Sequence, residues 1–283
     1  MELQVLKNGV LTVSVANKGA EIQSVKSADN KEYIWEGNPD FWTGHASVLF
    51  PICGGLKDDK FVYGGREYTL NKHGFGRVKT YEVEKTDETS VTYLLRSDDE
   101  TLRQYPFEFE LRITYELKGN SLLVSYNVRN MGEKPMYFSI GAHEAYACPG
   151  GIEGFKIVFE KEETLDAYVL DGNLLENNYV RIMSGCRELP MKYDYFAVDA
   201  LVFKNIKSRA VELTDGTRKI KVEFPGHDYF LIWTKPNAEY ICIEPWCGIQ
   251  DNVNSDYDIT KKEGIIKLDG KDAYNVSHRI TFD

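Results

Sequence analysis

Hydrophobic and polar residues alternate with a period of two in many short stretches of this chain. The clearest stretches are residues 12–15, 90–96, 108–116, 121–129, 155–159, 210–213, 219–224, 229–234 and 240–244. This alternation predicts half-buried β-strands, because successive side chains of a strand point to opposite faces. No stretch keeps helical periodicity over three turns. We therefore expect a chain built of strands.

Turn-forming pairs separate the predicted strands. Asn-Gly, Gly-Gly, Asp-Gly and Pro-Gly pairs occur at residues 8–9, 64–65, 171–172, 215–216, 225–226 and 269–270. A parallel sheet would need amphipathic crossover helices, which the pattern does not supply. The sequence thus predicts an all-β fold, a sandwich or a barrel. Since no linker or repeat divides the chain, we expect one domain over residues 1–283.

Composition and charge argue against several classes of partner and site. The formal net charge is −10 and the basic residues are scattered, which argues against a nucleic-acid partner. No apolar run reaches membrane-spanning length and the N-terminus lacks a secretory pattern, so we expect a cytoplasmic protein with no membrane contact. The five cysteines are odd in number and widely spaced, which favours free thiols over disulfides. Neither the cysteines nor the histidines show metal-ligand spacing, so no metal site is predicted.

Two histidines stand in unusual surroundings. His73 lies in KHGFGR at residues 72–77, where glycines flank Phe75 and let the backbone approach a ligand. His143 lies in SIGAHEAY at residues 139–146, at the end of a predicted strand. Each pattern fits two interpretations equally well. His73 could cap a turn or bind a ligand, and His143 could be a core histidine or a catalytic one.

A carboxylate ends an apolar strand near the C-terminus. In YICIEPWCG, at residues 240–248, alternation places Glu244 on the face opposite two isoleucines. A buried carboxylate needs a partner or a function, because an unpaired buried charge is costly. An ion pair with a nearby basic residue is one explanation. The Trp246 ring, of the kind on which sugars stack, favours a functional role.

These motifs, in this order, resemble the aldose 1-epimerase (galactose mutarotase-like) family, in particular its LacX-like branch. The resemblance spans nearly the whole chain. It is carried by LFPICGGLKD at residues 49–58, HGFGR at 73–77, His143, DALVF at 199–203, IEPW at 243–246, and Asp251 with Asn252.

The resemblance implies a large antiparallel β-sandwich of the galactose mutarotase-like type, with a sugar in a groove and no cofactor. It also implies that Glu244 is the general base, His143 the general acid and His73 a second histidine near the ring oxygen. Asp199 matches a sugar-binding acid. Arg77, Phe75, Trp246 and Lys57 are further expected sugar contacts.

One position departs from the family pattern. Family members carry an arginine after the Phe-Pro pair, and the matching position here is Gly55. Lys57 or Arg77 could replace that contact, while a changed substrate or weak activity would follow if neither does.

The expected reaction interconverts the α and β anomers of a hexose by acid–base ring opening and reclosure. A hexose-6-phosphate 1-epimerase is an alternative that needs cationic donors, for which Arg77, Lys57 and Lys204 are available. A carbohydrate-binding protein without catalysis is a second alternative, to which Gly55 lends weight. The least favoured reading is a sandwich whose polar groove residues serve stability alone. The partner is a small sugar, and the sequence leaves monomer and homodimer open.

Overall fold

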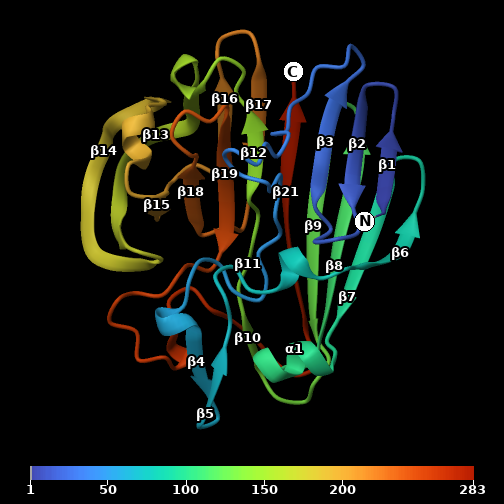
Figure 1. Ribbon diagram of the computed structural model, residues 1–283, viewed down its shortest axis with the longest axis vertical. Coiled ribbons are helices and arrows are strands. Elements are labelled where there is room, and N and C mark those ends of the chain that lie inside the picture. The colour runs from blue at the N-terminus through green and yellow to red at the C-terminus, as the bar shows by residue number, and fades with distance from the viewer. Residues whose placement is uncertain (1) are drawn as a thin grey trace.

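The computed structural model of the protein describes residues 2–283 and consists mainly of β-strands (Figure 1). Fourteen strands form one antiparallel sheet. In spatial order they are β11 (Ile140–Gly141), β19 (Tyr240–Cys247), β18 (Tyr229–Trp233), β15 (Leu201–Lys204), β13 (Lys156–Asp171), β16 (Ala210–Thr214), β17 (Lys219–Glu223), β21 (Ala273–Phe282), β9 (Ser121–Asn130), β8 (Phe109–Lys118), β7 (Ser90–Arg96) and β6 (Glu82–Thr86), with β12 (Glu144–Ala147) beside β19 and β14 (Leu174–Pro190) beside β13.

The remaining elements are small. A three-stranded sheet holds β1 (Leu3–Lys7), β2 (Leu11–Ala16) and β3 (Ile22–Ser27), while β4 (Lys60–Tyr63) pairs with β5 (Arg66–Thr69) and β10 (Met136–Phe138) pairs with β20 (Ile266–Leu268). The helix α1 (Asp99–Gln104) and five 3-10 turns (Lys57–Asp59, Gly76–Val78, Ile152–Gly154, Tyr193–Phe196 and Ile259–Lys261) complete the list. Across residues 2–283, no helix has the length and apolar character needed to cross a membrane.

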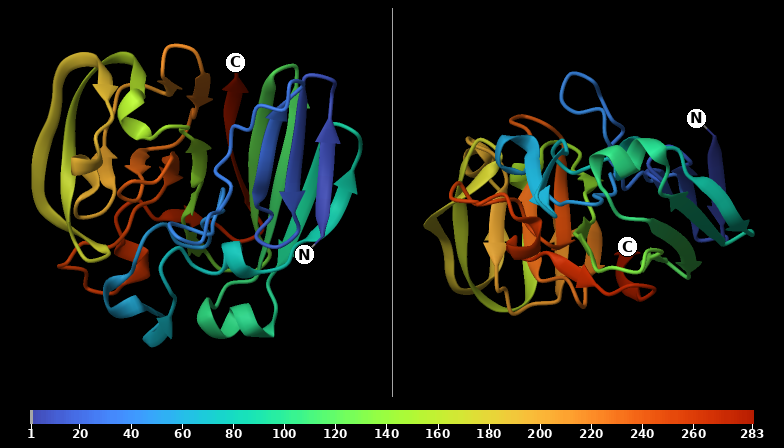
Figure 2. Two further views of the ribbon diagram at one scale, coloured as in Figure 1. Left: turned by 45° about the horizontal axis from the view of Figure 1, so that its top comes forward. Right: turned by 90° about the horizontal axis from the view of Figure 1, so that it is seen from below.

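The prediction of an antiparallel β-sandwich is confirmed, and each of the nine predicted stretches overlaps a strand. The β1–β3 sheet packs over β7, β8 and β9 (Figures 1 and 2). Tyr93 and Tyr115 cross this interface and donate hydrogen bonds to the carbonyls of Val15 and Ala20. Strand β8 buries every second residue against the core, as its alternation requires. The assignment of one domain stays a prediction, and its first residue lies outside the described range.

The other half of the large sheet continues past β11 and β12 into a further segment of the chain. The segment around residues 34–49 lies against β11 and β12, with bridges from Ile34 to Tyr146 and from Ala46 to Glu144. The loop region that carries β4 and β5 lies at one end of strands β18 and β19 (Figure 1). All eight residues of β19 are buried, with Ile241 and Ile243 in the main core and Tyr240 and Cys242 in a second apolar cluster. A polar residue on this strand therefore loses contact with bulk water.

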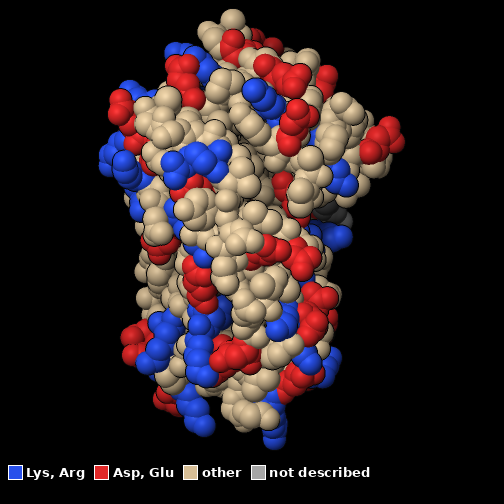
Figure 3. Space-filling view, turned by 90° about the vertical axis from the view of Figure 1, so that its left-hand side faces the viewer, with Lys and Arg blue, Asp and Glu red and all other residues tan. Residues whose placement is uncertain are grey.

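Strand β14 forms an edge of the large sheet. It pairs only with β13 among the described strands, and most of its residues are exposed. On this side of the molecule, Lys and Arg are interspersed with Asp and Glu around a central area of other residues (Figure 3). Tyr179, Val180 and Val198 are exposed apolar residues of the β13–β15 region. An unpaired edge can pair with a second chain, so the choice between monomer and homodimer stays open.

Candidate active site

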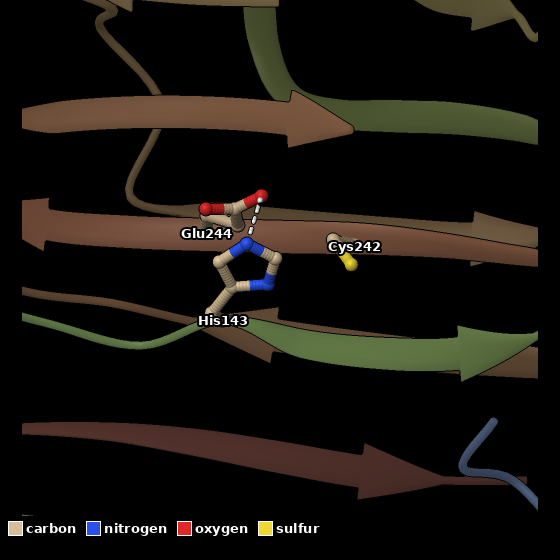
Figure 4. Close-up of side chains that lie close together, drawn as sticks. All are labelled: His143, Cys242 and Glu244. Atoms are coloured by element: carbon tan, nitrogen blue, oxygen red, sulfur yellow. Dashed lines mark ion pairs between the residues drawn. The ribbon is translucent and has the colours of Figure 1, made fainter. Parts of the chain in front are cut away.

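Strand register places His143 opposite Glu244. Glu144, the first residue of β12, pairs with Ile243 of β19 in an antiparallel ladder. One residue further along this register, His143 lies opposite Glu244. The next residue of β19 is Pro245, which has no backbone N–H to donate to the neighbouring strand. Cross-strand neighbours share a face of the sheet. Nε2 of His143 accordingly lies 3.5 Å from Oε1 of Glu244, as the dashed line in Figure 4 marks.

Both residues line a cavity of about 270 Å³. Its walls come from the loops before β4 and after β5, the β13–β14 turn, the residues before β15, strands β18 and β19, and the segment after β19. Other polar and aromatic side chains in its lining are Trp42, Ser47, Lys72, His73, Arg77, Asn173, Asp199, Trp233, Lys235, Trp246 and Gln250. The size and the mixed lining suit a small polar ligand with apolar faces.

His73 is held in one orientation by the backbone of Gly54. The Gly54 N–H donates to Nδ1 of His73 over 3.1 Å, and the Gly54 carbonyl accepts from the His73 N–H. A neutral imidazole that accepts at Nδ1 carries its proton on Nε2. His73 has a φ of +68°, a left-handed conformation that the following Gly74 shares. The ring therefore offers a hydrogen-bond donor to the cavity.

Burial controls the protonation of all three residues. Burial lowers the pKa of His143 to about 3. It lowers the pKa of His73 well below its usual value, and the neighbouring His143 ring adds to this effect. Burial also raises the pKa of Glu244 well above the usual carboxyl value, and the charge of Lys72 partly opposes this shift. The site therefore favours neutral imidazoles and a strongly basic carboxylate.

Tryptophan rings surround the two imidazoles. The ring centres of Trp42 and Trp233 lie 5.1 and 5.6 Å from that of His143, and Trp246 lies 5.6 Å from His73. Trp246 is fixed by a hydrogen bond from its ring N–H to a backbone carbonyl. These rings limit the access of water to the imidazoles and offer apolar faces to a ligand.

The structure brings Asp199 and Arg77 to the same cavity. Asp199 lies 3.6 Å from Nζ of Lys72, and its other carboxylate oxygen accepts from the Ala200 N–H. Arg77 donates to the backbone carbonyl of Lys72 over 3.1 Å. Lys72 thus lies at the centre of the polar rim, between the acid and the guanidinium.

Two expected sugar contacts lie elsewhere. Phe75 is 4% exposed and packs against Phe50 and Phe109 in the core, because burying its ring there removes more apolar surface from water. The Lys57 side chain lies outside the cavity. Its Nζ donates a hydrogen bond to the Ser255 carbonyl and lies over the ring of Tyr257. Neither residue lines the cavity. The structure therefore does not bring these two expected sugar contacts to the cavity.

The position of Gly55 is closed to any side chain. A Cβ on Gly55 would lie 2.7 Å from Cβ of Asn173, which reaches over from the β13–β14 turn. Asn173 itself lines the cavity. An arginine at position 55 would therefore need this turn to move, and Lys57 does not replace it.

Sequence reasoning missed several lining residues. Trp42, Asn173, Lys235 and Gln250 lie in turns and loops, where no periodic pattern indicates direction. Trp233 could have been found, because alternation along β18 puts it on the same face as Leu231.

Three buried side chains could supply ligands to a metal ion. One atom each from His143, Cys242 and Glu244 lie within 4.8 Å of one another (Figure 4). Burial raises the pKa of the Cys242 thiol well above its usual value, and a thiol must ionise to bind a metal. Cys242 also packs among apolar side chains outside the cavity lining. The geometry favours acid–base chemistry by His143 and Glu244.

A large antiparallel sandwich carries a histidine–carboxylate pair in a tryptophan-lined cavity. The family comparison assigns this chain to the carbohydrate epimerases or isomerases with a galactose mutarotase-like fold. The chain belongs to the aldose 1-epimerase family, whose profile matches residues 2–272. This agrees with the resemblance drawn from the motifs.

Individual relatives support the same assignment. The chain is 31% identical to the plasmid-encoded LacX protein of Lactococcus lactis subsp. lactis, over 98% of each chain. It superimposes with a TM-score of 0.95 on a galactose mutarotase related enzyme from Lactobacillus acidophilus, at 32% identity over 100% of this chain and 97% of that one. A galactose mutarotase-like protein from Lactobacillus casei gives 0.94 at 26% identity, with full coverage of both chains.

Proposed function

We propose that the protein is an aldose 1-epimerase that interconverts the α and β anomers of a hexose. The observation that carries the proposal is the His143–Glu244 pair, with Nε2 and Oε1 3.5 Å apart at the wall of a hexose-sized cavity. Ring opening needs a base for the anomeric hydroxyl and an acid for the ring oxygen. Family membership supplies the substrate class.

Glu244 and His143 exchange one proton with the sugar. Glu244 removes the proton of the anomeric hydroxyl while His143 protonates the ring oxygen, which breaks the bond from that oxygen to the anomeric carbon. The aldehyde then turns about its bond to the second carbon and closes on the other face. Reclosure moves both protons back. No covalent intermediate forms, and the pair returns to its starting state.

The pair must hold one proton in total to act. The form with ionised Glu244 and protonated His143 has no net charge, as has the form with the proton on Glu244. The charge of Lys72 favours an ionised Glu244, because it lowers the pKa of that carboxyl, and it makes a protonated His143 a stronger acid, because it lowers the pKa of the imidazole as well. A base with a raised pKa accepts a proton more readily, and an acid with a lowered pKa releases one more readily.

The other residues bind and orient the ring. His73 presents Nε2–H near the reacting centre, held by Gly54. Trp42 and Trp246 offer faces for the C–H bonds of the sugar. Asp199 and Arg77 line the cavity, and we expect them to bind its hydroxyl groups.

Polarimetry tests the proposal directly. Freshly dissolved α-D-glucose and α-D-galactose should reach anomeric equilibrium faster with the protein than without it. Acceleration with either sugar supports the assignment. Sugar binding measured by calorimetry without acceleration would instead identify a carbohydrate-binding protein.

The pH profile should reflect the one-proton state of the pair. At low pH the pair gains a second proton and loses its base, and at high pH it loses its only proton and therefore its acid. Since the pKa of His143 is lowered to about 3, kcat/KM should not decline between pH 7 and pH 5, whereas an ordinary histidine titrates near 6.5. The loss at high pH should follow the raised pKa of Glu244. Corrected polarimetric rates that fall with a midpoint near 6.5 would contradict this.

A hexose-6-phosphate is a second candidate substrate because the cavity carries three basic residues. Lys72, Arg77 and Lys235 line it, and within residues 2–283 Lys235 makes no ion pair. Lys204, suggested by the sequence, is paired with Glu263 instead. If a phosphate binds here, glucose 6-phosphate should be used better than glucose.

Lys235→Met distinguishes the two candidate substrates. It should lower kcat/KM for the phosphate about tenfold, because a charged hydrogen bond is lost, and lower that for glucose less. Parallel coupled assays with both sugars measure the ratio. A ratio that the substitution leaves unchanged would speak against the phosphorylated substrate.

A further inference from the structure

Gln250 is a cavity-lining residue whose side-chain amide has unused hydrogen-bonding capacity. The residue is 5% exposed and lines the same cavity as His143 and Glu244. Its Oε1 is inaccessible to solvent and has no hydrogen-bond partner within the described part of the chain. Exchange of the amide oxygen and nitrogen leaves the argument unchanged, because one of the two remains without a partner. Buried polar groups in proteins are nearly always paired, so an unpaired one at a ligand cavity calls for a ligand.

The backbone on both sides of Gln250 is clamped. Nζ of Lys262 donates to the Ile249 carbonyl over 2.6 Å and to Oδ1 of Asp251 over 2.9 Å. The side chains of Lys262 and Asp251 are only 3% and 5% exposed. The Asp251 N–H in turn donates to the Gly55 carbonyl. These bonds hold the backbone from which the Gln250 side chain extends before any ligand arrives, which reduces the entropy lost on binding.

Gly54 connects Gln250 to His73. A Cβ on Gly54 would lie 2.4 Å from Cβ of Gln250, so the Gln250 backbone packs directly on this glycine. The φ of Gly54 is +72°, which favours glycine independently. The N–H of the same residue holds Nδ1 of His73. The amide and the imidazole therefore flank one residue, and a ligand that contacts His73 lies within reach of Gln250.

We propose that Gln250 binds one hydroxyl group of the hexose and that the Lys262–Asp251 pair positions its amide. The inference rests on the proposed function for the nature of the ligand. A neutral amide both donates and accepts, as a hydroxyl does, whereas an anionic group would pair with the basic residues on the rim. Gln250 thereby selects for a sugar that has a hydroxyl at one ring position.

A series of monodeoxy sugars tests this inference. The probes are 2-, 3-, 4- and 6-deoxy-D-glucose, or the galactose counterparts if galactose is the better substrate. In the wild type, removal of the hydroxyl that Gln250 binds should lower kcat/KM about tenfold, because the amide loses its partner. Methionine has a similar length but no hydrogen-bonding amide. In Gln250→Met, kcat/KM for that one deoxy sugar should therefore lie within about twofold of kcat/KM for the parent sugar. The losses of kcat/KM for the other deoxy sugars should remain.

Two further variants separate binding from folding. Gln104→Met, at the end of α1 and outside the cavity lining, is the matched control and should keep the wild-type pattern. Lys262→Met, assayed below its melting transition, should raise KM for the parent sugar while kcat stays near the wild-type value. As in Gln250→Met, its kcat/KM for that one deoxy sugar should also come close to its kcat/KM for the parent sugar. A purely structural role of Lys262 would lower the amount of active protein without that change in specificity.

The outcomes distinguish this inference from the proposed function. Gln250→Met could turn over the parent sugar and still show the wild-type loss of kcat/KM for every deoxy sugar. That result would overturn the role of Gln250 and leave the epimerase assignment intact. If the wild type accelerates no hexose, calorimetric binding of the same series replaces turnover. A hexose that binds equally to wild type and Gln250→Met, or that binds to neither, would overturn the inference. Should Gln250→Met fail to fold, Gln250→Asn, which keeps a shorter amide, takes its place in the same comparison.

Discussion

A Glu244→Gln variant should fold normally and lose most of its acceleration of mutarotation. Glutamine has nearly the same shape as glutamate but cannot take the proton of the anomeric hydroxyl. Removal of a positioned general base costs about 10² to 10⁴ in rate. The melting temperature should stay the same or rise, since the carboxylate is 2% exposed and burial of its charge is unfavourable. Polarimetry and thermal unfolding of the same preparation measure both effects.

An exposed carboxylate provides the control for this variant. Glu162 lies on β13 and faces solvent, so Glu162→Gln should match the wild type in both measurements. If Glu244→Gln keeps more than about a tenth of the wild-type acceleration, a general-base role that supplies 10²-fold or more is ruled out.

A Lys262→Met variant should be strongly destabilised. The substitution leaves the Asp251 carboxylate buried with a backbone N–H from Lys57 as its remaining partner. Removal of one member of a buried ion pair costs about 3–5 kcal/mol, because the other charge stays uncompensated. The free energy of unfolding from denaturant titration measures this loss.

The double variant Lys262→Met/Asp251→Asn should recover part of the loss, since the stranded charge is gone. Lys156→Met breaks an exposed pair with Glu188 and should change the free energy of unfolding by less than about 1 kcal/mol. Equal effects of Lys156→Met and Lys262→Met would show that burial of the Lys262–Asp251 pair does not determine its contribution.

The strands that alternate between core and solvent were predictable. Strand β8 alternates between buried and half-buried side chains up to its last residues, and β9 does so after its first residue; a period of two is a local property of the chain. Strand β14 was missed, because it lies at an edge with most of its residues exposed and has no apolar face to reveal it. The short strands β11 and β12 were missed as separate elements, since their break reflects the partner strand rather than their own residues.

The sequence by itself determined the all-β class and the motifs that contain His73, His143 and Glu244, because glycines, strand ends and alternation act over a few residues. Only the tertiary structure decided that His73 faces the cavity while Phe75, two residues later, enters the core. It also decided that Asn173 covers Gly55 and that the Lys262–Asp251 pair clamps Gln250. These contacts join segments far apart in the chain. Strand register and core packing set them, and no local pattern of residues encodes either one.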